Sequence, residues 1–512
     1  MNVYPKNGRT TSGRNNIAIQ VYGDRIHIDQ TLYEYLIEFL LVFSSIKDKG
    51  DKSGAMEFHK QSDSIMNYYV YPRIGLKRFI FFDRAKKNSK ITVDEKAYKQ
   101  ICEMLKKSVN CNDQEQAKEV VEAIQDLLHG YAAVLKNRSW CAQALLPICP
   151  ELIFCEEMPL DQERAGLQWD TTINDSGFSD EMLKIETCFD GTRHNFLARG
   201  GEVYYLHILQ GLEACEDTTR IKLEKGLRNL LTAQNKNFSS IANWIQSTWE
   251  REMHLDAEKM VEEKRLEFIP ATGYINCAQK TIDELITFLS NEMHPIMRIE
   301  ILAKGVVFQI MRMMCERTSD YLGKGSMPWI VDMRSKKSGK TVMHLSADSF
   351  KNIEEAFVCA INKRIVEFRE ENNGDLKDTP YKYLTEARKK TLDVFRKLGK
   401  EMQCIIPSNG AMERFSLSED IVKFLVLSII KPGDKMTIDI FLKELFEHYS
   451  LVIGPEQYKA ACASEAKMDI ELTNCFMNNM KAFQDFLKNT GFLRDLSDAT
   501  SIVVNPFTEV TM

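Results

Sequence analysis

The chain has 512 residues, a mass of 59.0 kDa, a formal charge of −6 and a pI near 6.0. A chain of this length exceeds what one hydrophobic core can organise, so we expect two to four domains. A hydrophobic content of 44% excludes a largely disordered chain. The acidic balance argues against nucleic-acid binding by the surface as a whole, while local basic patches remain compatible with it.

The first 20 residues lack the apolar segment of a signal peptide. The strongest apolar run, residues 35–46, is interrupted by Glu38 and is too short to cross a bilayer. The 13 cysteines contain no C-x-x-C pair and are best interpreted as reduced, mostly buried thiols. We therefore expect a cytoplasmic protein that needs no membrane, no cofactor and no metal.

Residues 1–138 are expected to form an N-terminal α+β domain. The alternation of β-branched residues in Ile17–Tyr22 predicts a strand. Further strands are predicted at 68–71 and 78–82, and helices at 31–43, 92–109 and 113–135.

Residues 139–403 are expected to form a central helical domain. Residues 140–198 carry turn signals, and helices then dominate. The helices are predicted at 200–214, 218–233, 239–264, 279–292, 295–321, 348–371 and 380–401. One interruption, residues 327–345, has two apolar runs around Ser335–Gly339 and predicts a β-hairpin.

Residues 404–512 are expected to form a winged-helix-like C-terminal domain. A short strand at 404–407 precedes helices ending near Ile430, Tyr449 and Lys488, and the runs 492–496 and 502–504 predict a terminal hairpin. The fold class that follows is mainly α with smaller α+β parts: an N-terminal α+β region, a central helical region with a β-hairpin, and a winged-helix-like module.

Ser338-Gly-Lys-Thr341 resembles the end of a phosphate-binding loop. Such a loop needs a glycine five positions before Gly339, where this chain has Arg334. A helix should also follow the lysine, whereas the pattern predicts strands on both sides. A hairpin tip is therefore the favoured interpretation, and ATP binding is not supported.

A zinc site is the second motif considered, because six cysteines and histidines occur within one stretch: Cys141, Cys149, Cys155, Cys188, His194 and His207. Structural zinc sites use ligands two to four residues apart. The closest spacing here, from Cys149 to Cys155, is wider. Buried free thiols explain this pattern better than zinc.

The most unusual polar stretch, residues 186–202, leads directly into an apolar helix. Its candidate catalytic residues, if the protein is an enzyme, are Glu186, Asp190, Arg193, His194 and Arg199. The paired Gly200 and Gly201 permit close backbone approach, and the helix amino end can hold an anion. The alternative, which we favour, is a turn whose side chains bind loop carbonyls.

Three basic clusters interrupt the acidic balance. The first comprises Arg73, Lys77, Arg78, Arg84, Lys86, Lys87 and Lys90; the second Arg334, Lys336, Lys337 and Lys340; the third Lys382, Arg388, Lys389, Lys390, Arg396, Lys397 and Lys400. Each can neutralise phosphates or simply form a solvated surface. The second cluster is the best nucleic-acid candidate, because an exposed tip can enter a groove.

The C-terminal domain is itself acidic. From Gly410 onward it has 10 Lys and Arg against 15 Asp and Glu, a net charge of −5. Its expected recognition helix offers Lys481 and Lys488 against Glu471 and Asp485. Phosphate contacts dominate DNA affinity, so this domain is better suited to docking a protein than to reading DNA.

Three stretches carry a resemblance: Asn15–Phe43 with its Tyr-Gly-Asp-Arg turn, Arg193–Gly201, and Met436–Gly454. Together they resemble uncharacterised proteins of bacterial defence islands. The resemblance covers about a fifth of the chain and includes no catalytic signature. It implies an accessory role beside ATPases, nucleases or DNA-modifying enzymes, and no functional residue is carried over from it.

The sequence thus favours a non-enzymatic accessory or scaffold subunit of a bacterial multi-protein system for anti-phage defence, acting on foreign nucleic acid. Its expected partners are other protein subunits, with DNA or RNA as a further ligand. Two alternatives stay open: an enzyme of unfamiliar type, such as a nuclease, centred on 186–202, and a sequence-independent DNA-binding protein.

Overall fold

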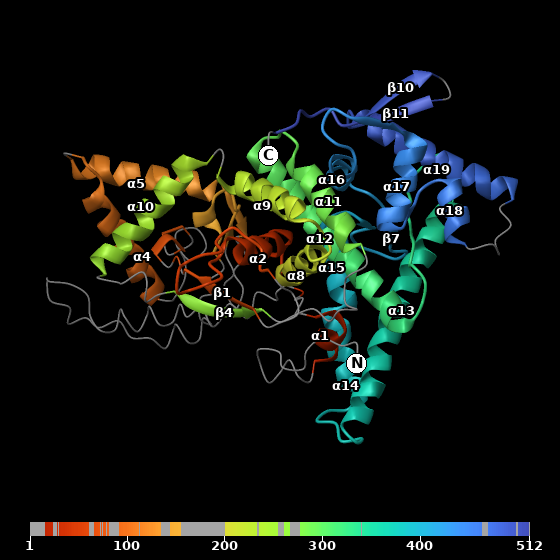
Figure 1. Ribbon diagram of the computed structural model, residues 1–512, viewed down its shortest axis with the longest axis horizontal. Helices are drawn as coiled ribbons and strands as arrows, with labels where there is room; N and C mark the ends of the chain where they lie inside the picture. The colour runs from red at the N-terminus through yellow and green to blue at the C-terminus, as the bar shows by residue number, and fades with distance from the viewer. Residues whose placement is uncertain are drawn as a thin grey trace.

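The computed structural model (Figure 1) is 65% helical and 9% strand, which confirms the mainly α class. It describes residues 16–510 except for the following gaps: 24–27, 29, 61–65, 72, 74, 78, 81–91, 112, 135–143, 155–199, 233–234, 254–260, 267–276, 339, 463–468 and 498–499. No described helix is both long enough and apolar enough to cross a membrane.

Central helices form the middle of the molecule. Their bounds are α2 Leu32–Ser44, α8 Gly200–Leu212, α9 Asp217–Thr232, α11 Ala278–Leu289, α12 Pro295–Leu322 and α16 Glu419–Ile429. Every residue of α2 from Glu34 to Phe43 is buried, because α8 and α12 both pack against it. A helix that is apolar on most of its surface is expected at such a position, and its two carboxyl groups, Glu34 and Glu38, are hydrogen-bonded.

Helices α4, α5 and α10 lie at one end of the molecule (Figure 1). The C-terminal unit, residues 404–512, extends to the other end. The bounds of this first group and its neighbours are α4 Thr92–Ser108, α5 Gln114–His129, β2 Ala132–Val134, β3 Ala144–Leu145, η1 Pro150–Leu152 and α10 Lys236–Glu252. The helix predicted over 113–135 therefore ends at His129, and the chain then enters β2.

The predicted strand at 17–22 is wrong: Ile17–Tyr22 forms helix α1. All six of its side chains are buried. The alternation of residue types therefore does not correspond to one buried and one exposed face, which is what a strand prediction assumes. Asn16 caps the helix by accepting from the Ile19 amide. Buried Arg317 and Arg364 then bind Val21 and Gln20, which fixes α1 against α12 and α13.

Of the strand predicted at 78–82 only Phe79 and Ile80 are described, and both are helical, which contradicts a strand at these two positions. The predicted strand at 68–71 is confirmed as β1 (Met66–Val70), and its antiparallel partner is β4 (Glu262–Leu266). The end of the helix predicted over 239–264 is thus a strand. A partner almost two hundred residues away cannot be inferred from local spacing.

The predicted β-hairpin at 327–345 is wrong. β5 (Trp329–Ile330) pairs in parallel with β9 (Leu451–Val452), residues 336–338 form the 3-10 turn η3, and α13 (Thr341–Glu371) starts immediately afterwards. The buried positions of α13 continue at helical spacing through 342, 346, 350, 353 and 357. This long helical pattern decides the structure of 341–345, although those residues alternate over a short stretch as a strand would.

Helices α13, α14 (Pro380–Lys390) and α15 (Leu392–Glu401) follow one another, and α13 and α14 form an arm that projects from the body (Figure 1). The single helix predicted over 380–401 is broken at Thr391, whose backbone (φ −120°, ψ −76°) is not helical.

The C-terminal unit contains the predicted helices and terminal hairpin. Its elements are β6 Ile405–Ile406, β7 Arg414–Phe415, α16, β8 Lys435–Thr437, α17 Ile438–Tyr449, β9, α18 Pro455–Ala461, α19 Ile470–Asn489, β10 Leu493–Ser497 and β11 Thr500–Val504. The strands β10, β11 and β8 form an antiparallel sheet in that order. Thr437 and Asp469 cap α17 and α19, as their side chains accept from backbone amides.

One continuous core joins the three expected domains, from Ile17 to Val503. Buried Asn479 of α19 donates to the carbonyls of Val331 and Ile453 (both 2.9 Å) and accepts from the Met333 amide. This side chain therefore fixes α19 directly onto the segment that follows β5.

Candidate functional site

The five candidate catalytic residues of the 186–202 stretch, Glu186, Asp190, Arg193, His194 and Arg199, all lie outside the described residues. The described part begins with Gly200 and Gly201, the first residues of α8. A Cβ atom on Gly201 would overlap the backbone oxygen of Tyr35 and lie 2.7 Å from the Phe39 amide nitrogen. The paired glycines thus serve the close approach of α8 to α2.

The amino end of α8 already holds a carboxyl group of the protein itself. The Gly201 amide donates to Oε2 of Glu38, at 2.9 Å, and Gln30 donates to Oε1, at 2.7 Å. Burial raises the pKa of the Glu38 carboxyl well above its usual range, while the Gly201 amide acts in the opposite direction. This arrangement favours a structural role for the start of α8 over capture of an external anion.

Two members of the considered zinc stretch are described. Cys149 is buried, and His207 contacts Thr281 through Nε2 at 3.1 Å. Among the described residues, no three His, Cys, Asp or Glu side chains are grouped to hold a metal ion. Cys141, Cys155, Cys188 and His194 lie outside that part of the chain.

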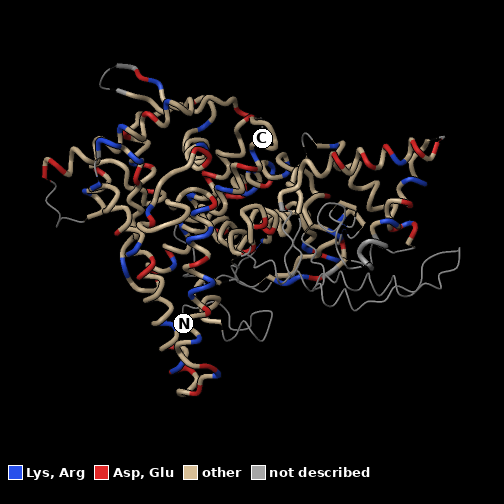
Figure 2. The backbone as a smooth tube through the Cα atoms, turned by 180° about the vertical axis from the view of Figure 1, so that it is seen from behind, with Lys and Arg blue, Asp and Glu red and all other residues tan. Residues whose placement is uncertain are grey.

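The three basic clusters differ in how their charges are used. Most of the first cluster lies outside the described residues; Arg73 binds Asn243, and Lys77 is buried. In the third cluster, four of the seven cations form ion pairs: Lys382, Arg396, Lys397 and Lys400. The helix α14–α15 surface is thereby largely neutralised, as Figure 2 illustrates with its intermixed acidic and basic segments.

The second cluster is different. Arg334, Lys336, Lys337 and Lys340 are all exposed, and none forms an ion pair with a described carboxylate. The nearby Asp332 is occupied, since its Oδ2 binds Nε of Arg414 at 2.8 Å. We call residues 334–340 the basic loop.

The basic loop is held against α19. Asn478 donates to the carbonyl of Lys337 at 3.3 Å, and its neighbour Asn479 binds the amide of Met333. Arg334 adopts a left-handed backbone (φ +58°), a costly conformation for a residue with a Cβ atom. The sequence prediction of an exposed basic tip is thus right in its exposure and wrong in its hairpin structure.

The chain runs from β5 through the basic loop into α13, and this strand–loop–helix order is also that of a phosphate-binding loop. A helix does follow Lys340, contrary to the predicted strand, and no side chain caps its amino end. The first turn of α13 contains no acidic residue, which also favours an anion there. Arg334 still occupies the glycine position, and 336–338 form a 3-10 turn instead of an open loop of amides.

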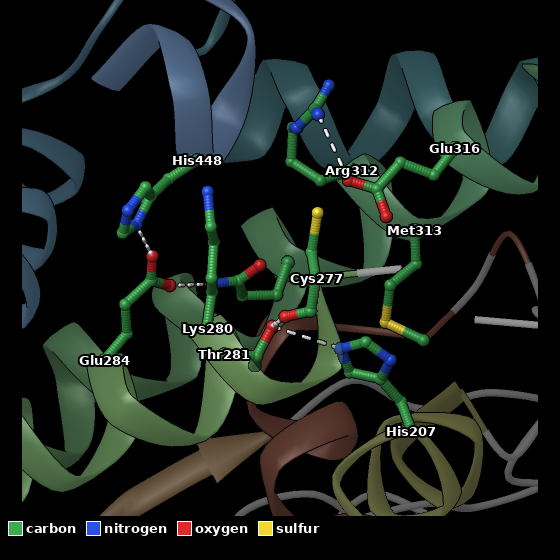
Figure 3. Close-up of a pocket in the computed structure, with 10 residues that line it drawn as sticks. His207, Cys277, Lys280, Thr281, Glu284, Arg312, Met313, Glu316 and His448 are labelled. Carbon is green, nitrogen blue, oxygen red and sulfur yellow. Dashed lines mark hydrogen bonds and ion pairs between the residues drawn. The ribbon is translucent and has the colours of Figure 1, made fainter. Parts of the chain in front are cut away.

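A polar pocket lies between α8, α11, α12 and α17 (Figure 3). Glu284 is its centre: Oε2 accepts from the Tyr449 hydroxyl (2.6 Å) and the Gln309 amide (2.8 Å), and Oε1 contacts Nδ1 of His448 (2.6 Å). Nε2 of His448 contacts Glu444 at 2.9 Å. The pocket has a volume of about 10 Å³, room for about one water molecule.

A more open cavity of about 260 Å³ adjoins the pocket and shares Cys277, Arg312, Glu316 and His448 with it. Nη2 of Arg312 binds Glu316 at 3.3 Å, and the Arg312 guanidinium lies over the Trp329 ring. Burial, with the neighbouring Glu316 carboxylate, raises the pKa of the Cys277 thiol to about 12. At neutral pH this thiol is protonated and is a poor nucleophile.

The pocket therefore works as an internal cross-link, because Glu284 joins α11 to α12 and α17, and Arg312 pairs with Glu316. Sequence reasoning missed it, since its residues come from segments more than two hundred positions apart. The local signals are the spacings of four between Arg312 and Glu316 and between Glu444 and His448, each of which places both residues on one helical face.

We predict that Cys277 reacts with iodoacetamide about a thousandfold more slowly at pH 8 than an unperturbed thiol does, since only the thiolate reacts. The rate should rise about tenfold per pH unit through pH 10 without levelling off. Peptide mapping by mass spectrometry measures the rate of alkylation of Cys277, with exposed Cys359 as the internal control. Equal labelling of both cysteines at pH 8 would contradict the prediction.

No protein-family model, curated protein or solved structure matches the chain.

Proposed function

We propose that this protein is a non-catalytic accessory subunit of a bacterial multi-protein system, and that it contacts nucleic acid through the basic loop. The observation that carries the proposal is that all four cations of the loop are exposed and unpaired with described carboxylates. Some exposed lysines elsewhere, such as Lys351 and Lys382, have carboxylate partners, and others, such as Lys431 and Lys435, have none among the described residues; the loop differs in having four such cations within seven residues.

Backbone phosphates supply most of the affinity of proteins for nucleic acid, and they are bound by lysine and arginine without regard to sequence. Four cations within seven residues, none of them paired with a described carboxylate, give a local positive field on an otherwise acidic protein. The uncapped amino end of α13 adds partial positive charge at the same place. The ligand chemistry is thus the phosphodiester backbone, not a base sequence.

In this proposal the C-terminal unit is a winged-helix-like module. Its order of helix, strand, two main helices and terminal hairpin supports that assignment, as does the sheet order β10–β11–β8. Its expected recognition helix, α19, contributes little positive charge, because Lys488 is paired with Asp495 at 2.5 Å. We therefore assign phosphate contact to the basic loop and protein docking to the module.

The resemblance to defence-island proteins supports placing the subunit in an anti-phage system, where the ligand would be foreign nucleic acid. The self-contained bonding of the polar pocket, with its protonated thiol, supports a non-catalytic role. Size-exclusion chromatography with the products of neighbouring genes tests the assembly: a strictly monomeric protein that binds none of them would count against it.

The phosphate contact is tested by fluorescence anisotropy with a labelled 30-base-pair duplex and a 30-nucleotide single strand of unrelated sequence. We expect binding to both, weakening steeply between 50 and 200 mM salt. Replacing Arg334, Lys336, Lys337 and Lys340 by alanine should weaken binding at least tenfold. It should also reduce the slope of log affinity against log salt by about 3 to 4, roughly 0.9 for each phosphate that is no longer neutralised.

The matched control removes four surface cations that are paired with carboxylates: Lys106 and Lys118, which are half-buried, and Lys351 and Lys382, which are exposed. Both variants change the net charge equally, so only a local effect separates them. Equal loss in both variants, or binding of the native protein that does not depend on salt, would rule out the proposed contact.

A further inference from the structure

A groove of about 570 Å³ lies in the C-terminal unit between α17, α18 and α19, which sit side by side in Figure 1. Its size falls within the range of specific binding pockets, about 300–1,000 Å³. Its lining side chains on α17 run from Asp439 to Glu447. The eight steps from the first to the last of these residues span about 12 Å, the length of about two helical turns of a partner.

The floor of the groove is apolar and adaptable. Leu442 and Phe446 of α17 line it together with Met477 and Met480 of α19. Met477 is 45% exposed although it is a large apolar side chain. Unbranched methionine side chains adjust their shape to apolar surfaces, and they are frequent where helices dock.

The rim of the groove is acidic. Asp439, Glu447 and Glu456 stand around it with a single cation, Lys443. Lys443 pairs with Glu447 at 3.7 Å, whereas Asp439 and Glu456 form no ion pair with a described residue. Two carboxylates are therefore left to attract positive charge, in a domain whose net charge from Gly410 onward is −5.

We propose that this groove docks one basic amphipathic helix of a partner protein. The partner's apolar side chains, three and four residues apart, would rest on Phe446, Met477 and Met480. Its lysines or arginines would lie beside Asp439 and Glu456. Charge complementarity selects this occupant, since an acidic or neutral helix would leave the two carboxylates without partners.

The groove and the basic loop use different sides of α19. Asn478 faces the loop, whereas Met477 and Met480 line the groove. One helix thus separates a phosphate-binding surface from a protein-binding surface. The inference rests on the proposed role as one subunit of an assembly, but it is independent of the phosphate contacts.

The test uses the full-length protein and two synthetic 18-residue peptides. One has leucines at positions i, i+3, i+4, i+7 and i+11 with lysine and arginine elsewhere, and the other has glutamate at those charged positions. Isothermal titration calorimetry should show micromolar binding of the basic peptide and none of the acidic one. Met477→Gln should weaken binding at least tenfold, and Asp439→Asn with Glu456→Gln should weaken it most at low salt.

Ile470→Gln is the matched control, because Ile470 is also an exposed apolar residue of α19 but does not line the groove. It should leave peptide binding unchanged, and no groove variant should alter the anisotropy of nucleic-acid binding. Failure of the basic peptide to bind, or equal binding of both peptides, would overturn the inference. A dimer in light scattering that Met477→Gln dissociates would also overturn it, by assigning the groove to a second copy of the chain.

Discussion

Replacing Glu284 by alanine should loosen the contact of α17 with α11 and lower the free energy of unfolding by about 3 kcal/mol or more. The change removes the acceptor for Tyr449, Gln309 and His448 at once. Buried donors that lose their partner bear the full cost of lost hydration, and breaking a buried charged contact from one side costs about 3–5 kcal/mol.

Hydrogen exchange measured by mass spectrometry locates this effect, since α11 and α17 should lose protection before α4 and α5 do. Glu444→Ala is the matched control, because it also removes a carboxylate from His448 but leaves Glu284 in place. The Glu444 side chain is 32% exposed in the native protein. We therefore expect Glu444→Ala to lower the free energy of unfolding by less than about 1 kcal/mol. Equal deprotection in both variants would mean that Glu284 is not the centre of the cross-link.

The second large effect is expected for Gly201→Ala, which should separate α8 from α2. A methyl group at this position meets backbone atoms of Tyr35 and Phe39, which cannot rotate away as a side chain can. The hydrogen bond from the Gly201 amide to Glu38 would be lost with the separation. Overpacking costs about 1–3 kcal/mol where the surroundings adjust, and we expect about 3 kcal/mol or more here.

Thermal unfolding of the variant, followed by circular dichroism, should show a lower Tm and earlier loss of helical signal. Gly325→Ala serves as the control, since a Cβ atom there meets nothing within 4 Å. A Gly201→Ala protein as stable as Gly325→Ala would show that α8 and α2 are not in close contact.

Elements with local start signals were predictable from the sequence. Thr437 was expected to cap a helix ending at Tyr449, and its side chain does accept from the Ile440 amide. The terminal hairpin was recognisable from two short runs, 492–496 and the β-branched 502–504, around a polar turn. In both cases the deciding interaction lies within a few residues of the chain.

Elements whose environment comes from distant segments were not predictable. Ile17–Tyr22 is helical because tertiary contacts surround it, and Trp329–Ile330 finds its strand partner more than 120 residues away. Short alternating runs are consistent with both helix and strand until that environment is known. The polar pocket was beyond sequence reasoning for the same reason, since its lining residues run from His207 to His448.

The placement of α1 has a consequence for biosynthesis. Gln20 is bound by Arg364, 344 positions later in the chain, and Val21 by Arg317. On the ribosome, α1 must therefore wait until most of the polypeptide has been made before its polar partners exist. A nascent chain stalled before residue 364 should leave this apolar helix open to chaperones.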